Sequence, residues 1–261
     1  MTIFALDVIN LDRMPWYYFS PHLDDIALSC GGLLWEQAEA GELVEVWTLC
    51  AGDPPDGPLS PFAQSLHSRW ETGAEAVGIR RLEDAAACQR LGAAYRHFGL
   101  PDCIYRRSPV DGSALYPSEE SIFGPLHPAE GGLVHDLSVE LDLLLPGDAV
   151  IVCPLTLGGH VDHRLARAAI ERIARPVWYF ADYPYARQHG SQITDLLPDG
   201  YELVLFKISE SGMQAWGEAV AAHRSQISTF WPDTQAMVAA LGEYYQDNSG
   251  IPLWRPGNGG A

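Results

Sequence analysis

Two short stretches, far apart in the chain, combine histidine and aspartate at the end of an apolar run. Residues 20–25 (Ser-Pro-His-Leu-Asp-Asp) place His22, Asp24 and Asp25 directly after the aromatic run 16–19. Adjacent carboxylates repel each other unless a positive charge lies between them, so a divalent cation with a neutral imidazole as co-ligand explains the set. The alternative is that the two carboxylates only cap the following helix, where they suit the free N–H groups.

The second stretch favours the metal site over simple capping. Residues 158–163 (Gly-Gly-His-Val-Asp-His) again follow an apolar run, 149–153, and again precede a helical pattern. In an open parallel sheet, ligands bind in the crevice at the carboxyl ends of the strands, so both stretches can converge on one cation. The spacing alone does not decide whether His160 or His163 is the downstream ligand.

Three protein ligands with an open position are typical of zinc hydrolases. His22, Asp25 and one downstream histidine would supply two neutral ligands and one anionic ligand. A bound metal polarises a substrate carbonyl and makes water more acidic. Asp24, beside the metal, would take the proton of the water, and the remaining histidine would face the oxyanion or protonate the leaving amine.

The elements that must position these residues alternate between strand and helix. Apolar runs without strict alternation predict strands at 16–19, 43–50, 149–153 and 177–180, and residues 95–98 (Tyr-Arg-His-Phe) are expected to form a further strand. Helical patterns lie between or after them at 26–40, 61–92 (in two parts, interrupted near Gly78), 133–145 and 161–174. This order predicts an α/β fold with a mainly parallel sheet and helices on both faces.

The remainder of the chain departs from this pattern. Residues 103–131 show no regular periodicity, which is typical of an insertion at a functional rim or of a mobile excursion. The last third predicts a loop at 183–198, a strand at 201–208, helices at 213–223 and 234–245, and a frayed Gly- and Pro-rich tail at 252–261. We find no linker, so residues 1–261 are expected to form a single domain.

Composition limits the partners. The chain has 34 acidic and 16 basic residues and a formal net charge of -18. No basic run is present, so we expect no nucleic-acid partner and no adhesion to anionic membranes. Five cysteines without Cys-x-x-Cys spacing indicate buried free thiols in a reducing compartment. The first 14 residues show no signal-peptide pattern and no membrane span is evident, so a cytoplasmic location is expected.

Both stretches resemble the motifs of a known enzyme family. Residues 21–25 (Pro-His-Leu-Asp-Asp) and 159–163 (Gly-His-Val-Asp-His) are similar to the Pro-His-x-Asp-Asp and His-x-Asp-His motifs of the PIG-L/LmbE-like zinc-dependent N-deacetylases. The likeness continues, in the same order, in Arg80-x-x-Glu83, in 100–102 (Leu-Pro-Asp) and in 183–185 (Tyr-Pro-Tyr). It covers about two-thirds of the chain. The family's Glu after the paired Asp is replaced here by Ile26, which indicates a subgroup with another substrate.

The resemblance implies a Rossmann-like fold and removal of the acetyl group from N-acetylglucosamine-type sugars or their conjugates. On matching positions it implies that His22, Asp25 and His163 bind Zn²⁺, with another divalent metal such as Fe²⁺ as the alternative. It further implies that Asp24 is the general base and that His160 is the electrophile or proton donor.

Arg80 and Asp102 lie in segments that resemble the family's substrate-contacting ones. The simpler interpretations are that Arg80 pairs with Glu83 along a helix and that Asp102 is a turn residue. Asp162 is expected to orient an imidazole or to cap a helix.

The sequence is compatible with two other functions. One is hydrolysis of a larger amide in an amino-sugar conjugate, and the other is a metal-binding homologue without turnover. Asp24 and His160 argue against the second, because a protein that only holds a metal needs neither. The expected partner is a small-molecule amino-sugar conjugate, and the sequence leaves a homo-oligomer open.

The other histidines and the tryptophans have simpler explanations. Six histidines without a partner pattern are expected to be surface or satisfied core residues: His67, His97, His127, His135, His189 and His223. The tryptophans are expected in the core or at a rim, with sugar stacking by Trp16 and Trp178 as the alternative.

Overall fold

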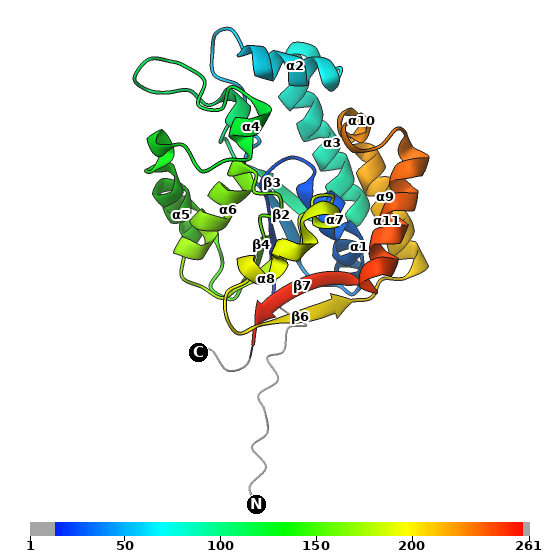
Figure 1. The fold of residues 1–261 in the computed structure, drawn as a ribbon. Helices are drawn as coiled ribbons and strands as arrows, with labels where there is room; N and C mark the ends of the chain where they lie inside the picture. The colour runs from blue at the N-terminus through cyan, green and yellow to red at the C-terminus, as the bar shows by residue number, and fades with distance from the viewer. Residues whose placement is uncertain (1–13, 258–261) are drawn as a thin grey trace, which may run out of the picture.

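The computed structural model describes residues 14–257, and its centre is a seven-stranded sheet of order β3-β2-β1-β4-β5-β7-β6 (Figure 1). The parallel strands are β1 (Trp16–Ser20), β2 (Val44–Thr48), β3 (Ala94–His97), β4 (Val150–Pro154) and β5 (Val177–Phe180). β7 (Ile251–Pro256) pairs antiparallel with both β5 and β6 (Tyr201–Phe206). The predicted α/β fold with a mainly parallel sheet is confirmed.

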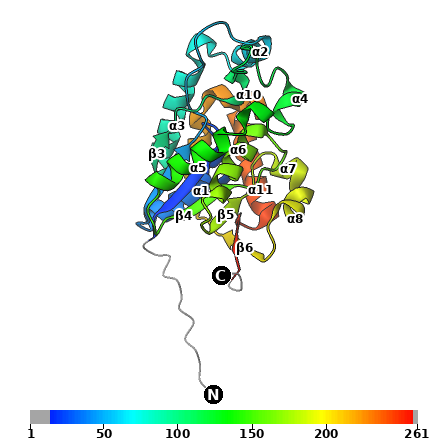
Figure 2. The same ribbon diagram turned by 90° about the vertical axis from the view of Figure 1, so that its left-hand side faces the viewer.

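Helices cover both faces of this sheet, as Figures 1 and 2 show. One face carries α1 (Asp25–Glu39), α3 (Ala76–Leu91), α9 (Glu210–Ala222) and α11 (Thr234–Asn248), and the other carries α5 (Leu133–Leu144) and α6 (Val161–Arg172). Shorter helices are α2 (Pro61–Arg69), α4 (Glu119–Ile122), α7 (Ala186–His189), α8 (Ile193–Leu196) and α10 (Arg224–Phe230). Single 3₁₀ turns lie at η2 (Gly73–Glu75), η3 (Cys103–Tyr105), η4 (Pro128–Glu130) and η5 (Gly190–Gln192).

The continuous apolar runs follow from burial on both faces of the sheet. Along β1, Trp16 and Tyr18 belong to the core beneath α1 and α9, whereas Tyr17 and Phe19 belong to the core beneath α5 and α6. Each fully buried side chain of this size contributes about 1.5–3 kcal/mol. β1 is therefore held firmly from both sides, and the loop after it starts from a fixed point.

The strand order places the two His/Asp stretches next to each other. From β1 the chain proceeds outward to β2 and β3, then returns to β4 on the other side of β1 and continues to β5. The carboxyl ends of β1 and β4 thus border the point where the strand order reverses, which is where open α/β sheets bind ligands.

The prediction of a frayed tail at 252–261 is wrong for the strand β7. Ile251 and Leu253 are fully buried, and β7 lies inside the sheet rather than at its end. Pro252 and Pro256 suggested a break, but the apolar residues around them pack against the core of α1 and α11. Residues 258–261 lie outside the described residues.

Other boundaries also differ from the predictions. The two helices in 61–92 are separated at residues 70–75 rather than near Gly78, which lies within α3. Residues 183–198 contain short helices, and α10 had no distinct signal. All five cysteines are buried free thiols, and no helix among residues 14–257 is long and apolar enough to cross a membrane.

Two helical glycines provide a test of the contact between α1 and α9. A Cβ on Gly31 would lie 2.6 Å from Cδ1 of Trp216, whose indole N–H donates to the carbonyl of Ala27 (2.8 Å). We expect Gly31→Ala to lower the free energy of unfolding by about 1–3 kcal/mol, because the ring must move. In the control, Gly78→Ala in α3, the added Cβ meets no atom within 4 Å, so a gain of about 0.5–1 kcal/mol is expected. Urea denaturation measures both, and equal stabilities would contradict the close contact.

Candidate metal and catalytic site

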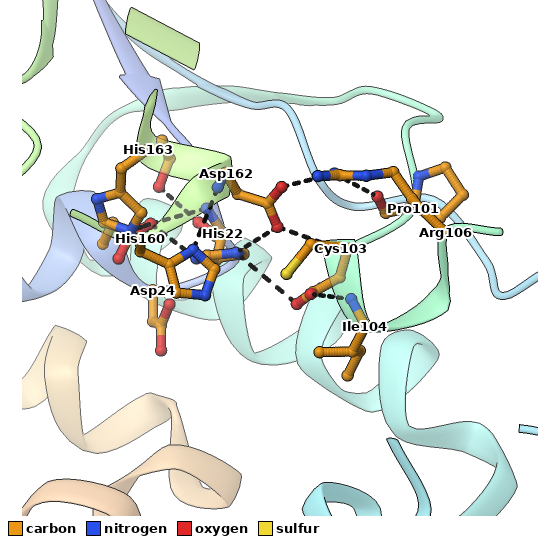
Figure 3. Close-up of polar contacts among 12 residues, drawn as sticks. His22, Asp24, Pro101, Cys103, Ile104, Arg106, His160, Asp162 and His163 are labelled. Carbon is orange, nitrogen blue, oxygen red and sulfur yellow. Dashed lines mark hydrogen bonds and ion pairs between the residues drawn. The ribbon is translucent and has the colours of Figure 1, made fainter. Parts of the chain in front are cut away.

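The loop after β1, the loop after β4 and the first turn of α6 bring three imidazole rings together (Figure 3). The ring centroid of His22 lies 4.8 Å from that of His160 and 5.4 Å from that of His163, and the latter two are 5.5 Å apart. His22 comes from the first stretch and the other two from the second. The predicted convergence of the two stretches is therefore present in the structure.

The sequence permits the sharp turn that the second loop needs. Gly158 and Gly159 have φ angles of 79° and 77°, in the left-handed region that favours glycine. His160 then caps helix α6, and its Nδ1 accepts a hydrogen bond from the backbone N–H of Asp162 (3.2 Å). This contact directs the other ring nitrogen of His160 away from the helix, and the residue lines the pocket described below.

Asp25 and two of the histidines have the geometry of a metal-binding set. Asp25 Oδ2 lies 3.4 Å from Nδ1 of His22 and 3.5 Å from Nε2 of His163. A tetrahedral zinc ion with bonds of about 2.0–2.1 Å places its ligand atoms about 3.3 Å apart. The two distances from Asp25 therefore fit a zinc ion. Nitrogens of His22, His160 and His163 also lie within 4.8 Å of one another, so the ring of His160 borders the same position.

Two further aspartates orient the imidazoles. Nδ1 of His163 lies 2.6 Å from Asp182, and Nε2 of His22 lies 3.0 Å from Asp162. Carboxylates placed in this way fix the tautomer of a ligating histidine and leave the opposite nitrogen free for the metal. Asp182 was not singled out from the sequence, and its signal is its place two residues after β5, just before the Tyr-Pro-Tyr segment.

Asp24 has a different environment from Asp25. It occupies the N-cap position of α1, yet its side chain makes no capping hydrogen bond. Its Oδ1 instead lies 3.5 Å from Nη2 of Arg80. Burial raises the pKa of Asp24, and the charges of Arg80 and His223 oppose this rise only in part. Burial acts on Asp25 in the same direction, but the charges of His163 and His22 outweigh it and lower its pKa.

Asp162 is a fully buried carboxylate with several partners. Its Oδ2 accepts a hydrogen bond from the backbone N–H of Cys103 (2.9 Å), and its Oδ1 pairs with Nη1 of Arg106 at 2.5 Å. Burial would favour the neutral acid, but Arg106 and His22 keep the pKa of Asp162 well below its ordinary value. The prediction that Asp162 orients an imidazole is confirmed.

These contacts show what the irregular span 103–131 contributes. Glu130, near its end, pairs with the same Arg106 and accepts a hydrogen bond from the hydroxyl of Tyr116 (2.5 Å). The span is therefore attached to the site by buried ion pairs. Its side chains Ile104, Ile122 and Phe123 also line the pocket beside the site, as expected for a functional rim.

The site opens into a pocket of about 280 Å³. Arg80 and Asp102 line its polar side. Oδ2 of Asp102 lies 3.8 Å from Nε2 of His22 and 4.0 Å from Nη1 of Arg80. Asp102 also caps the turn η3 by accepting the N–H of Ile104 (3.2 Å). Asp102 is therefore both a turn residue and a residue that lines the pocket.

Some simpler interpretations are confirmed and others are wrong. Arg80 does not pair with Glu83, and its guanidinium lies 4.9 Å from the ring of Trp70, which lines the pocket. Trp16 and Trp178 belong to the core, so Trp70 is the tryptophan at the site. His67 is a satisfied core residue, bound to Gly73 and Tyr105.

His223 departs from the expectation for the lone histidines. It is buried, yet neither ring nitrogen has a hydrogen-bond partner among the described residues. Its positive charge, when the ring is protonated, would lower the pKa of Asp24.

The sequence is similar to a known family and to characterised proteins. The family model described as PIG-L: GlcNAc-PI de-N-acetylase matches residues 17–174. The 2'-N-acetylparomamine deacetylase of Niallia circulans is 28% identical over 213 residues, which cover 72% of this chain and 73% of that protein. The corresponding deacetylase of Streptomyces fradiae is 29% identical over 180 residues, which cover 66% of this chain and 58% of that protein.

Solved structures share the whole architecture. The zinc-inhibited form of teicoplanin deacetylase superposes with a TM-score of 0.78 at 28% identity, covering 93% of this chain and 97% of that chain. The deacetylase of the A40926 pseudoaglycone superposes with a TM-score of 0.70 at 27% identity, covering 94% and 97%.

The buried pair of Arg106 and Asp162 gives a stability prediction. Arg106→Met removes the cation between two buried carboxylates, so the free energy of unfolding should fall by about 3–5 kcal/mol. Arg255→Met is the matched control, because Arg255 pairs with Glu202 at the surface, where about 0–1 kcal/mol is expected. Urea denaturation measures the free energy of unfolding of both variants. If Arg106→Met loses no more than Arg255→Met, the buried ion pairs are not needed for stability.

Proposed function

The chain belongs to the PIG-L family of de-N-acetylases, and on this premise we propose how its residues remove the N-acetyl group from an amino-sugar substrate. Members of this family are metal-dependent de-N-acetylases, and the relatives described above are named as deacetylases of 2'-N-acetylparomamine and of teicoplanin. We assign Zn²⁺ as the metal, with Fe²⁺ as the alternative. The observation that carries the proposal is the spacing of Asp25 from His22 and His163 at the switch point of the sheet.

His22, Asp25 and His163 are the proposed metal ligands. Asp182 holds Nδ1 of His163, so Nε2 is the nitrogen that faces Asp25. Within residues 14–257 no carboxylate is hydrogen-bonded to the ring of His160, and its Nδ1 accepts the N–H of Asp162. When bound, the metal polarises the acetyl carbonyl and makes water a stronger acid.

Asp24 is the proposed general base. Its raised pKa brings it toward the working range of a base, and Arg80 holds its carboxylate in place. It takes a proton from the attacking water as the new C–O bond forms, and it returns this proton to the leaving nitrogen as the C–N bond breaks. The products are acetate and the free amino sugar.

His160 is the proposed oxyanion stabiliser. Burial lowers its pKa well below the ordinary value, which favours the neutral ring. Because Nδ1 accepts the N–H of Asp162, the proton of the neutral ring belongs on Nε2. This N–H can donate to the carbonyl oxygen as negative charge develops on it.

The pocket supports a sugar conjugate as the substrate. Arg80 and Asp102 offer a charged side for ring hydroxyls, whereas Phe62, Leu66 and Phe230 offer an apolar side. A free monosaccharide has little apolar surface, so the apolar side suits the group to which the sugar is attached. A larger acyl group on the same nitrogen is the second candidate occupant, and comparing release of acetate with release of longer fatty acids distinguishes the two.

Asp24→Asn tests the base. The side chain keeps its size but cannot accept the proton, so kcat should fall by about 10²–10⁴-fold. The zinc content, measured by elemental analysis, should stay at the wild-type value, because Asp24 is not a proposed ligand. Unchanged deacetylation would remove Asp24 from the mechanism.

His163→Ala tests the ligand assignment. This variant should lose bound zinc after dialysis, whereas His160→Ala should keep the metal and lose rate by about 10²–10³-fold, the usual effect of removing one oxyanion donor. The exposed His135→Ala is the control and should change neither property. If His160→Ala loses the metal and His163→Ala retains it, the two roles must be exchanged.

A further inference from the structure

Helix α10 (Arg224–Phe230) forms one wall of the catalytic pocket. Its residues Gln226, Thr229 and Phe230 line the same pocket as His22 and Asp24. The helix is short and follows α9 with only His223 between them. A helix of this length is marginal by itself, so contacts from outside must hold it in place.

Glu83 on α3 supplies such a contact. Its Oε1 accepts the backbone N–H of Ser225 (2.9 Å), and its Oε2 accepts the hydroxyl of Ser225 (2.6 Å). Ser225 lies in the first turn of α10, where backbone N–H groups have no partner within the helix and a carboxylate is favourable. Glu83 therefore caps α10 from another helix, one turn after Arg80 on α3.

The hydrogen bonds continue from Ser225 to the pocket. Nε2 of Gln226 donates to Oγ of Ser225 (2.9 Å), which fixes the rotation of the Gln226 amide. Gln226 is 5% exposed, and the structure gives its side chain no other hydrogen bond among residues 14–257. Its amide oxygen and second amide hydrogen thus remain for a ligand in the pocket.

Other polar groups around this pocket are also unsatisfied. Oγ1 of Thr229 and Nε of Arg80 are buried and have no hydrogen-bond partner within the described part of the chain. Both residues line the pocket. Native proteins leave few buried polar atoms unpaired, so two of them in the same pocket as Gln226 indicate a hydroxyl-bearing ligand.

We propose that Gln226 is a specificity-determining residue that hydrogen-bonds a ring hydroxyl of the acetylated sugar, and that Glu83 is the positioning residue that holds it there through Ser225. This inference rests on the proposed function and names the element that recognises the sugar. Arg80 and Glu83, one turn apart on α3, then serve one pocket: the first contacts Asp24, and the second fixes the wall that carries Gln226.

The test uses the methyl glycoside of N-acetylglucosamine and its 3-, 4- and 6-deoxy analogues, with acetate release as the assay. The wild-type enzyme should prefer the parent over one deoxy analogue by about 10-fold in kcat/KM, the effect of one lost hydrogen bond. Gln226→Leu should lower kcat/KM for the parent glycoside by about 10-fold, mainly through a higher KM. For that deoxy analogue, the same variant should cause no further loss of kcat/KM. This non-additivity would pair Gln226 with that hydroxyl.

Variants of Glu83 on α3 and a control variant on α10 complete the experiment. Glu83→Ala should reduce the preference for the same hydroxyl while its zinc content stays unchanged, and Glu83→Gln should restore part of it, because the amide oxygen still accepts a hydrogen bond. Ser228→Ala, on the exposed side of α10, should match the wild type.

The outcomes separate this inference from the proposed function. If the wild type releases acetate but Gln226→Leu shows the same kcat/KM pattern across the series, the inference is overturned and the deacetylase function stands. If the zinc-loaded wild type releases acetate from none of the four glycosides, the proposed function fails and the inference fails with it.

Discussion

The hydrogen bond between His22 and Asp162 joins the two parts of the chain on which the site depends. It links the loop after β1 to the first turn of α6, across the point where the strand order reverses. Asp162 also binds the start of the 103–131 span through Cys103 and Arg106. One buried carboxylate therefore fixes a proposed metal ligand, the helix that carries another, and the rim of the pocket.

Such a concentration of buried charge needs a rigid surrounding structure. Asp24, Asp25, Asp162 and Asp182 are all buried within the same region, and each isolated charge would be strongly unfavourable there. Each carboxylate has an arginine or histidine partner, and the two apolar cores on either face of β1 keep the partners at their distances. The fold thus holds an arrangement of acids that would not persist in a flexible loop.

The same arrangement divides adjacent carboxylates between two tasks. Asp24 and Asp25 are neighbours in sequence, but the helix start turns them toward different partners, Arg80 in one case and two imidazoles in the other. Their pKa values move in opposite directions as a result. This separation allows one to serve as a base and the other as a ligand in the mechanism that we propose.

The parallel sheet, the strand ends that carry the two His/Asp stretches, and their meeting at one crevice could be predicted from the amino-acid sequence, because these features depend on local apolar runs and on the geometry common to open α/β sheets. The family resemblance implied that His163 rather than His160 binds the metal. Only the tertiary structure shows the contact between His163 and Asp182 that supports this proposal, because Asp182 comes from another strand end. The tertiary structure likewise placed β7 within the sheet and attached α10 to Glu83. Those features depend on contacts between residues far apart in the chain, and no periodicity or spacing within one segment encodes them.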